Sequence, residues 1–180
     1  DVRRSILDAA LPHVEELGWS TEALSAGAEE AGYSRAAHGM FSEGGFALVL
    51  HAMDLSTERV ALRFVELEEE GVLGELGATE RVKEGLVARL ESIAPFVRQG
   101  VWARAMAMGL LPQHALLTTQ RLGHCADEIW HQAGDISTDS SWYTRRALLL
   151  SILVSTELHM LTDDSVAFSD SWEFLDRSLD

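Results

Sequence analysis

Cysteine, basic side chains and long apolar runs are all scarce in this 180-residue sequence. The single cysteine, Cys125, excludes an intrachain disulfide framework and fits a reducing compartment. No apolar run approaches the length that an α-helix needs to cross a bilayer. No signal or transit segment is visible, and the chain starts at Asp1 instead of methionine. We therefore expect a trimmed fragment, in which a missing targeting sequence says nothing about location.

The shortage of basic residues gives the chain a formal net charge of −15, with 14 Lys and Arg against 29 Asp and Glu. A protein of this charge repels phosphate backbones at long range, so nucleic-acid binding starts at a disadvantage. The imbalance is already present in residues 1–60, which hold ten acidic side chains. The four basic side chains of that stretch are Arg3, Arg4, Arg35 and Arg59.

Valine and isoleucine are scarce, whereas alanine, leucine and glutamate are abundant, and this balance favours helix over sheet. Alternating strand patterns are absent. The length fits one domain, or one domain with a small appendage, and an apolar fraction of 47% supplies a substantial core. We predict an all-α fold.

Helical spacing of apolar residues places the expected elements along the chain. Three glycines in residues 71–79 mark a joint, which divides the chain into residues 1–70 and residues 71–180. Pro95 is expected to kink or end the helix that contains it, because proline lacks a backbone donor. The expected helices are 2–17, 21–31, 35–40, 46–69, a helix from Glu80, 101–111, 118–133, 143–161 and a last short helix after residue 165.

The order helix, helix, glycine-containing turn and short helix is the helix-turn-helix plan. The segments 6–10, 31–35 and 40–42 resemble the N-terminal module of TetR-type regulators. A ligand-responsive TetR-type transcriptional regulator is therefore one hypothesis. However, the helix that would read DNA offers only Arg35 and His38, and a DNA reader needs several phosphate contacts to hold its register. We predict that the chain does not bind nucleic acid.

A polar run from Gly134 to Arg146 lies between two strongly helical segments. Its Asp, Ser and Thr residues can cap a helix, which would have Trp142, Tyr143, Arg145 and Arg146 in its first turns. Cations are unfavourable at that end of a helix dipole, and Trp, Tyr and Arg dominate interface energetics. The run is therefore either a binding surface or a corner with a buried Trp142 and arginines paired to nearby acids.

Residues 101–111 and 147–154 are apolar almost all round. A helix without a polar face is normally buried in the middle of a bundle. The alternative is an apolar cavity between the two segments, because methionine suits adaptable pockets and the small residues beside it leave room. The sequence does not separate a filled core from one that a ligand fills.

Catalytic and metal-binding patterns are incomplete. Glu128 and His131 have the Glu-x-x-His spacing of ferritin-like di-iron sites, but no second copy occurs. The pairs 124–125 and 157–159 lack the remaining ligands of a metal site. No nucleophile elbow or phosphate-binding loop occurs either. We predict no catalytic residue, no metal and no cofactor, and keep an iron enzyme that uses Glu128 and His131 as a third hypothesis.

The C-terminal half carries the most specific pattern of the chain. Residues 134–146 read Gly-Asp-x-Ser-Thr-Asp-x-x-Trp-Tyr-Thr-Arg-Arg, and segments 155–157, 163–165 and 171–175 accompany this run. Together they closely resemble the lipid-binding accessory proteins of ubiquinone (coenzyme Q) biosynthesis, in the eukaryotic mitochondrial branch. The pairs Gly18-Trp19, Glu22-Ala23 and Met40-Phe41 fit the same family, so the resemblance spans essentially the whole chain.

The resemblance implies a TetR-like helical bundle that is neither a transcription factor nor an enzyme. Members bind isoprenoids, quinone intermediates and phospholipids in an interior pocket. They present the quinone intermediate to the di-iron hydroxylase that acts on demethoxyubiquinone. The family fold also implies a homodimer through the last two long helices, here about 143–161 and 165–179. The implied location is the mitochondrial matrix, peripheral to the inner membrane.

Carried over to this sequence, the hydroxylase-binding residues are Asp139, Trp142, Tyr143 and Arg146, of which Arg146 is also expected to support the structure. The residues expected to bind lipid are Trp102, Met106, Met108, Leu110, Leu111, Leu148, Leu149, Ile152, Leu153 and Thr156. The family continues into a further amphipathic helix that docks on the membrane. This chain ends at Asp180, so we expect it to lack that helix.

Overall fold

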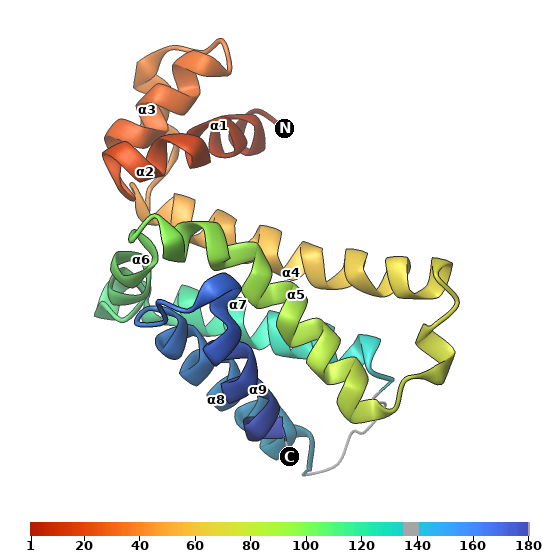
Figure 1. The fold of residues 1–180 in the computed structure, drawn as a ribbon. Helices are drawn as coiled ribbons and strands as arrows, with labels where there is room; N and C mark the ends of the chain where they lie inside the picture. Colours follow the sequence, from red (N-terminus) through yellow and green to blue (C-terminus); the bar gives the residue numbers. More distant parts are fainter. Residues whose placement is uncertain (135–140, 180) are drawn as a thin grey trace. The chain divides into compact units, whose positions relative to one another are not determined.

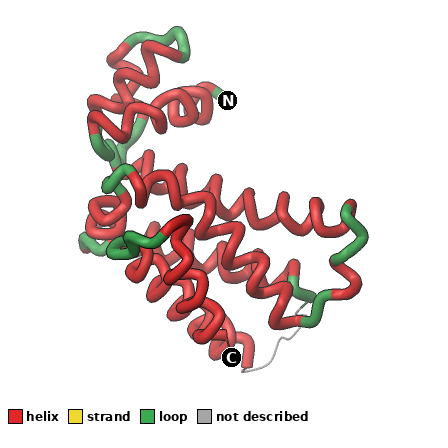
Figure 2. The backbone as a smooth tube through the Cα atoms, in the orientation of Figure 1, coloured by secondary structure: helices red, strands yellow, loops and turns green. Residues whose placement is uncertain are grey.

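The computed structural model describes residues 1–134 and 141–179, and within these ranges the chain forms helices, turns and loops without a strand (Figures 1 and 2). The predicted all-α fold is confirmed. By backbone contacts the chain divides into two units. The first unit joins Asp1–Asp54 to Pro95–Thr119, and the second joins Leu55–Ala94 to Gln120–Asp180. The division expected at residues 70 and 71 stays a prediction.

The first unit begins with α1 (Val2–Ala10), the 3-10 turn η1 (Leu11–His13), α2 (Val14–Leu17), α3 (Thr21–Glu30) and the 3-10 helix η2 (Arg35–Met40). The single helix expected over residues 2–17 is interrupted at η1, where Pro12 supplies no backbone donor. Ser20 and Ser34 cap the next two helices, as predicted, by accepting from the amides of Ala23 and Ala36. Gly27 lets α3 approach α1 closely, because a Cβ at this position would lie 2.4 Å from that of Ala10.

An aromatic cluster fills the core of the same unit beside α6 (Trp102–Gly109). The ring centre of Trp19 lies 5.3 Å from that of Phe96 and 5.9 Å from that of Trp102. The indole Nε1 of Trp19 donates to the carbonyl of Val101 over 2.8 Å. Trp102 is therefore buried as a core residue of this unit.

The second unit is a bundle of long helices. It takes the larger part of α4 (Phe46–Glu69), the first four-fifths of α5 (Ala78–Arg98), the later part of α7 (Pro112–Gln132), α8 (Ser141–Met160) and α9 (Ser169–Leu179). Two further 3-10 turns are η3 (Leu73–Glu75) and η4 (Val166–Phe168). Figure 1 shows α8 and α9 side by side. The core of the unit includes Val60, Phe64, Leu86, Leu90, Ile93, Ile129, Leu149, Leu153, Met160 and Leu175.

Several boundaries differ from those expected. Of the two outcomes expected at Pro95, an end of the helix is wrong, since α5 continues to Arg98, and a kink stays a prediction. The helix expected from Thr118 starts six residues earlier, because Pro112 at the first position of α7 needs no amide partner. Among the described residues no helix combines the length and apolar character that a membrane span requires.

The expected burial of the two apolar segments is wrong for several of their residues. Leu110 is 81% exposed and Leu111 is 42% exposed, because α6 ends at Gly109 and the pair forms the turn into α7. On α8, Leu148 is 61% exposed. Helix α8 buries one face, which includes Leu149, Leu153 and other residues at helical spacing, and leaves apolar side chains on the opposite face.

An ion pair crosses the core of the second unit from α5 to α8. Arg89 Nη2 lies 3.2 Å from Glu157 Oε1, and both side chains are almost fully buried. Burial also raises the pKa of the nearby Cys125 thiol, which is typical of an unreactive cysteine. Removing one partner of such a pair would leave an uncompensated charge in the core.

The corner between α8 and α9 is closed by Asp163. Its carboxylate accepts hydrogen bonds from the amides and the hydroxyls of Ser165 and Ser171. Burial raises the pKa of Asp163, but these hydrogen bonds outweigh it and lower the pKa to about 2. Ala167 and Phe168 at this corner have φ angles of 55° and 60°, in the left-handed region. Asp163 therefore stabilises an unusual backbone course into α9.

Candidate functional site

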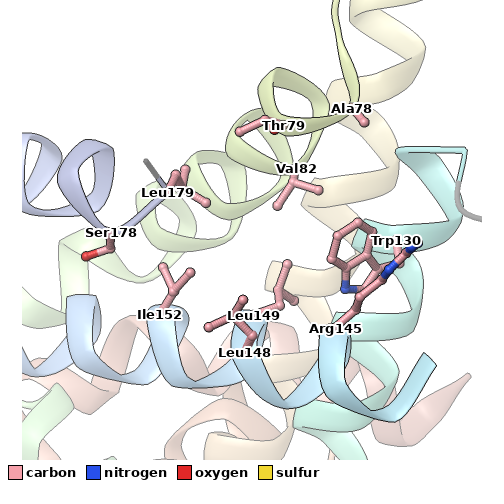
Figure 3. A pocket seen from close by; sticks show the side chains of 10 residues that line it. All are labelled: Ala78, Thr79, Val82, Trp130, Arg145, Leu148, Leu149, Ile152, Ser178 and Leu179. Atoms are coloured by element: carbon pink, nitrogen blue, oxygen red, sulfur yellow. The ribbon is translucent and has the colours of Figure 1, made fainter. Parts of the chain in front are cut away.

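A pocket of about 220 Å³ lies in the second unit, where ends of α5, α7, α8 and α9 converge (Figure 3). Helix α8 contributes the largest share of its wall, through residues at positions i, i+3, i+4 and i+7 of one helix face. The lining residues are Ala78, Thr79, Val82, Trp130, Arg145, Leu148, Leu149, Ile152, Ser178 and Leu179.

The body of the pocket is aliphatic. Val82 and Leu149 are buried, and Ile152 lies next to them in Figure 3. Leu148 continues the apolar surface toward solvent, and Leu179 of α9 faces it from the other side. These side chains offer contacts to an apolar ligand but no charge.

One end of the pocket is different in character. Figure 3 shows the side chains of Trp130 and Arg145 next to one another at that end. The guanidinium carbon of Arg145 lies 5.9 Å from the centre of the Trp130 ring. The pocket therefore joins an aliphatic body to an end with an indole and a cation.

The first turns of α8 also carry the aromatic pair singled out in the sequence. Trp142 and Tyr143 pack edge to face, with ring centres 4.7 Å apart. Tyr143 is 74% exposed, whereas Trp142 is half-buried. Arg146 lies over the Trp142 ring at 3.9 Å and donates from Nε to the carboxylate of Asp127. Each of the two interpretations of this segment therefore fits part of it. Tyr143 offers an exposed surface, as a binding site would, and Arg146 is paired to an acid, as a structural corner would require.

Of the four residues expected to contact the hydroxylase, the structure describes three. Trp142, Tyr143 and Arg146 lie together on α8. Asp139 lies outside the described residues. The role of these four residues in partner binding stays a prediction.

The residues expected to bind lipid are distributed over both units. Leu148, Leu149 and Ile152 line the pocket. Leu153 and Thr156 are buried further along α8, and the Thr156 hydroxyl donates to the carbonyl of Ile152 over 2.8 Å.

The remaining predicted lipid-binding residues belong to the first unit. Trp102 is part of its aromatic cluster, Met106 and Met108 are half-buried, and Leu110 and Leu111 are exposed. None of them lines the pocket described above. Their role in lipid binding also stays a prediction.

Sequence reasoning did not find most of the other lining residues. Trp130 lies inside the Glu-x-x-His pattern, whose spacing points to Glu128 and His131 as metal ligands and does not indicate a pocket residue between them. In the structure His131 is exposed and Glu128 accepts a hydrogen bond from Gln132 over 2.7 Å. Val82 and Leu179 are almost a hundred residues apart, and no local spacing predicts that they meet.

Two family models match the chain. The model described as COQ9 matches residues 115–180, and the model of the N-terminal domain of ubiquinone biosynthesis protein COQ9 matches residues 1–29. The chain belongs to the COQ9 family. The COQ9 model covers the C-terminal part of the chain with Trp130, Arg145 and the aromatic pair, which are the residues of the pocket end and its neighbourhood.

Individual relatives agree with this COQ9 assignment. The mitochondrial ubiquinone biosynthesis protein COQ9 of Xenopus tropicalis is 41% identical over 184 residues, which cover 99% of the chain and 56% of that relative. The corresponding protein of Drosophila melanogaster is 37% identical, covering 99% of the chain and 54% of the relative. That of Homo sapiens is 37% identical, covering 98% of the chain and 56% of the relative. The chain thus spans somewhat more than half the length of these COQ9 relatives.

Proposed function

We propose that this COQ9-family chain is a non-enzymatic lipid-binding protein of mitochondrial ubiquinone biosynthesis. It holds a polyprenyl quinone intermediate, or another isoprenoid or phospholipid, and presents it to the di-iron demethoxyubiquinone hydroxylase. The observation that carries the proposal is the arrangement of α8. One helix supplies the pocket wall through Arg145, Leu149 and Ile152, and carries Trp142 and Tyr143 in the preceding turn.

The pocket supports lipid binding through its aliphatic lining. Each buried methylene contributes roughly 0.8 kcal/mol of transfer free energy. Lifting a lipid from a bilayer is close to neutral only where the receiving surface is equally apolar, which the aliphatic body provides. The volume of about 220 Å³ is below the roughly 300–1,000 Å³ of pockets that hold drug-sized ligands. The pocket therefore accommodates one end of a lipid, and the exposed Leu148 extends the apolar path outward.

The aromatic start of α8 supports presentation to a protein partner. Exposed tyrosine and half-buried tryptophan next to arginine are the residue types that supply most binding energy in protein interfaces. Arg146 holds the Trp142 ring in place from the inner side, so Tyr143 projects from a fixed base. A partner docked there would lie within a few residues of Arg145 at the pocket end.

The absence of DNA binding is part of the proposal. The segment in the position of a DNA-reading helix, η2, is a six-residue 3-10 helix. The Arg35 side chain is paired with Glu29 over 2.7 Å. A major-groove reader inserts an α-helix or a β-ribbon with base-contacting side chains, and η2 offers neither.

Location and assembly complete the proposal. The relatives are named as mitochondrial proteins, and we assign the chain to the matrix, peripheral to the inner membrane through an amphipathic segment. The outer face of α8, with apolar Leu148 and Leu158 exposed, fits pairing of two copies through α8 and α9. Such exposed apolar faces mark interaction sites.

The test is transfer from vesicles. The protein is incubated with phosphatidylcholine vesicles that contain a radiolabelled short-chain quinone, and is then separated by gel filtration. We expect quinone to elute with the protein, and more of it to remain there when the hydroxylase is absent than when it is added. A protein fraction free of quinone in both cases would contradict the proposal.

A further inference from the structure

The turn between α6 and α7 carries the two most exposed leucines among the described residues. Leu110 is 81% exposed and Leu116 is 69% exposed, and Leu111 between them is 42% exposed. We call these three residues the leucine turn. Single exposed leucines are ordinary, but apolar side chains gathered at one place on a surface mark an interaction site.

Two hydrogen bonds close this turn and fix its course. Thr118 Oγ1 donates to the carbonyl of Gly109 over 3.0 Å, and His114 Nδ1 donates to the carbonyl of Met108 over 2.9 Å. A Cβ at Gly109 would lie 3.0 Å from Thr118 Oγ1, so α6 and α7 are in close contact there. The exposure of the leucine turn is therefore a property of an anchored backbone.

The charge of this part of the sequence is opposite to that of the whole chain. Asp and Glu make up 29 of the 180 residues, but none occurs from Ser92 to Ala126. The formal charges of that stretch are those of Arg98, Arg104 and Arg121. A protein with a net charge of −15 is repelled by an anionic surface, and a stretch without acids reduces that repulsion locally.

Exposed apolar residues on α4 have the opposite surroundings. Leu62 is 56% exposed and Val65 is 52% exposed. Glutamates lie three or four residues from one or the other, at positions 58, 66, 68 and 69, and residues at this spacing are neighbours on a helix surface. The leucine turn therefore differs from other exposed apolar residues by combining exposure with the absence of acids in the surrounding sequence.

We propose that the leucine turn is a membrane-docking surface, which inserts its three leucines into an anionic bilayer while the exposed Arg104 of α6 contacts lipid phosphates. Apolar side chains beside cations are the combination that holds peripheral proteins on anionic membranes. The three leucines expose a few hundred Å², well below the roughly 800 Å² that each partner buries in a standard protein interface. A bilayer needs no complementary surface, and is therefore the occupant that fits so small an apolar turn.

The inference rests on the proposed function only for its location at a membrane. It assigns the docking to the first unit, whereas the pocket belongs to the second unit. Leu110 and Leu111 were expected to bind lipid inside a cavity. In this proposal they contact lipid as part of the bilayer instead.

Vesicle flotation of the purified chain tests the docking surface. The vesicles consist of phosphatidylcholine, alone or mixed with phosphatidylglycerol, and contain no quinone. Wild type is compared with the leucine variant, which combines Leu110→Ser with Leu116→Ser, and with the charge variant Arg104→Glu. The matched control combines Leu62→Ser with Val65→Ser, which removes two exposed apolar side chains of α4. Ile152→Trp, which fills the pocket, shows whether the pocket contributes to attachment.

We expect wild type to float with the vesicles that contain phosphatidylglycerol. The leucine variant should bind them at least about tenfold more weakly, because two leucines no longer leave water on docking. Arg104→Glu should weaken the same binding about tenfold and leave binding to pure phosphatidylcholine unchanged. The α4 control and Ile152→Trp should float like wild type.

A fluorescent label reports insertion directly. Cys125 is buried and the pKa of its thiol is raised by burial, so a bimane reagent labels an introduced surface cysteine selectively. Leu110→Cys carries the label on the leucine turn, and Leu62→Cys carries it on α4. Phosphatidylcholine with a doxyl quencher on its acyl chain should quench the label at position 110 and not the label at position 62.

Absence of wild type from the vesicle fraction, equal flotation of wild type and the leucine variant, or an unquenched label at position 110 would overturn the inference. Loss of flotation in Ile152→Trp would do so as well, because attachment would then depend on the pocket. A leucine variant that floats normally but no longer self-associates or binds the hydroxylase would assign the turn to a protein partner. Each of these results leaves quinone transfer, and with it the proposed function, to be decided by its own test.

Discussion

The guanidinium carbon of Arg146 lies 3.9 Å from the centre of the Trp142 ring. The same side chain donates to the Asp127 carboxylate of α7, so one arginine joins the start of α8 to the neighbouring helix through an aromatic ring. The ring in turn supports the exposed Tyr143. Stability and surface presentation are therefore separable at this corner, because the inner contacts belong to Arg146 and the outer surface belongs to Tyr143.

Substitution of the inner residue is expected to lower stability. Arg146→Met removes an ion pair with a half-exposed carboxylate and a cation–π contact, and should reduce the free energy of unfolding by about 1–2 kcal/mol. Urea denaturation measures this change. Arg177→Met is the matched control, because its pair with Glu173 is exposed on both sides and should contribute less than about 0.5 kcal/mol. Equal losses in the free energy of unfolding for Arg146→Met and Arg177→Met would contradict a structural role for Arg146.

Substitution of the outer residue is expected to affect the partner alone. Tyr143→Ala removes a side chain that is 74% exposed, so the unfolding midpoint should stay within experimental error. Binding of the immobilised hydroxylase should fall at least tenfold, as for a central interface aromatic. Leu62→Ala, at a 56% exposed position of α4, serves as the control and should bind normally. Loss of a cooperative melt in Tyr143→Ala would show that the side chain belongs to the core instead.

The Asp163 corner is expected to give the protein an acid-sensitive step. The pKa of Asp163 in the folded chain is about 2, below its ordinary value of 3.8. The carboxylate thus contributes on the order of 2 kcal/mol of stability that is present above pH 4 and is lost as the pH falls from about 4 to 2. Urea midpoints of wild type and Asp163→Asn should differ at pH 7 and converge as the pH falls to about 2. Asp164 is the exposed neighbour and serves as the control, so the urea midpoint of Asp164→Asn should equal that of wild type at every pH. If the midpoints of wild type and Asp163→Asn differed by the same amount at every pH, the ionised Asp163 carboxylate would not be the source of the acid sensitivity.

The buried pair of Arg89 and Glu157 is expected to be the most sensitive polar contact of the second unit. Glu157→Gln leaves the guanidinium without its anion and should destabilise the fold by about 3–5 kcal/mol. The double variant Arg89→Met with Glu157→Gln should recover part of that loss, because no buried charge remains. Thermal unfolding of the single and double variants measures the recovery. A double variant that is less stable than Glu157→Gln alone would mean that Arg89 acts independently of the pair.

Local features of the fold could be predicted from the sequence because they depend on neighbouring residues. Ser20 and Ser34 cap helices through their own hydroxyls, and the helix over residues 46–69 has the bounds that its periodicity indicated. The interruption at Pro12 was missed, because a proline early in a helix is compatible with either outcome. The exposure of Leu148 could not be predicted for a different reason. A helical segment that is apolar all round does not indicate which of its faces packs against other helices and which faces solvent.

The pocket could be predicted only in part. Leu148, Leu149 and Ile152 were expected from the apolar stretch of one helix and from the family resemblance. Val82 and Leu179 depend on how α5 and α9 converge, which is a tertiary property. The unsatisfied indole of Trp130 is visible only once its surroundings are known, because the same residue on another helix face would be bonded or exposed.

Native mass spectrometry of the purified chain, followed by organic extraction, tests whether the pocket holds a lipid. Wild type is compared with Ile152→Trp, which fills the pocket, and with Leu62→Trp, which adds the same side chain to a 56% exposed position of α4 outside it. We predict a bound isoprenoid or phospholipid at near-stoichiometric ratio in wild type and Leu62→Trp, and a ligand-free mass for a folded Ile152→Trp. A ligand-free wild type after exposure to quinone-containing vesicles, or a lipid retained in full by Ile152→Trp, would contradict lipid binding at this pocket.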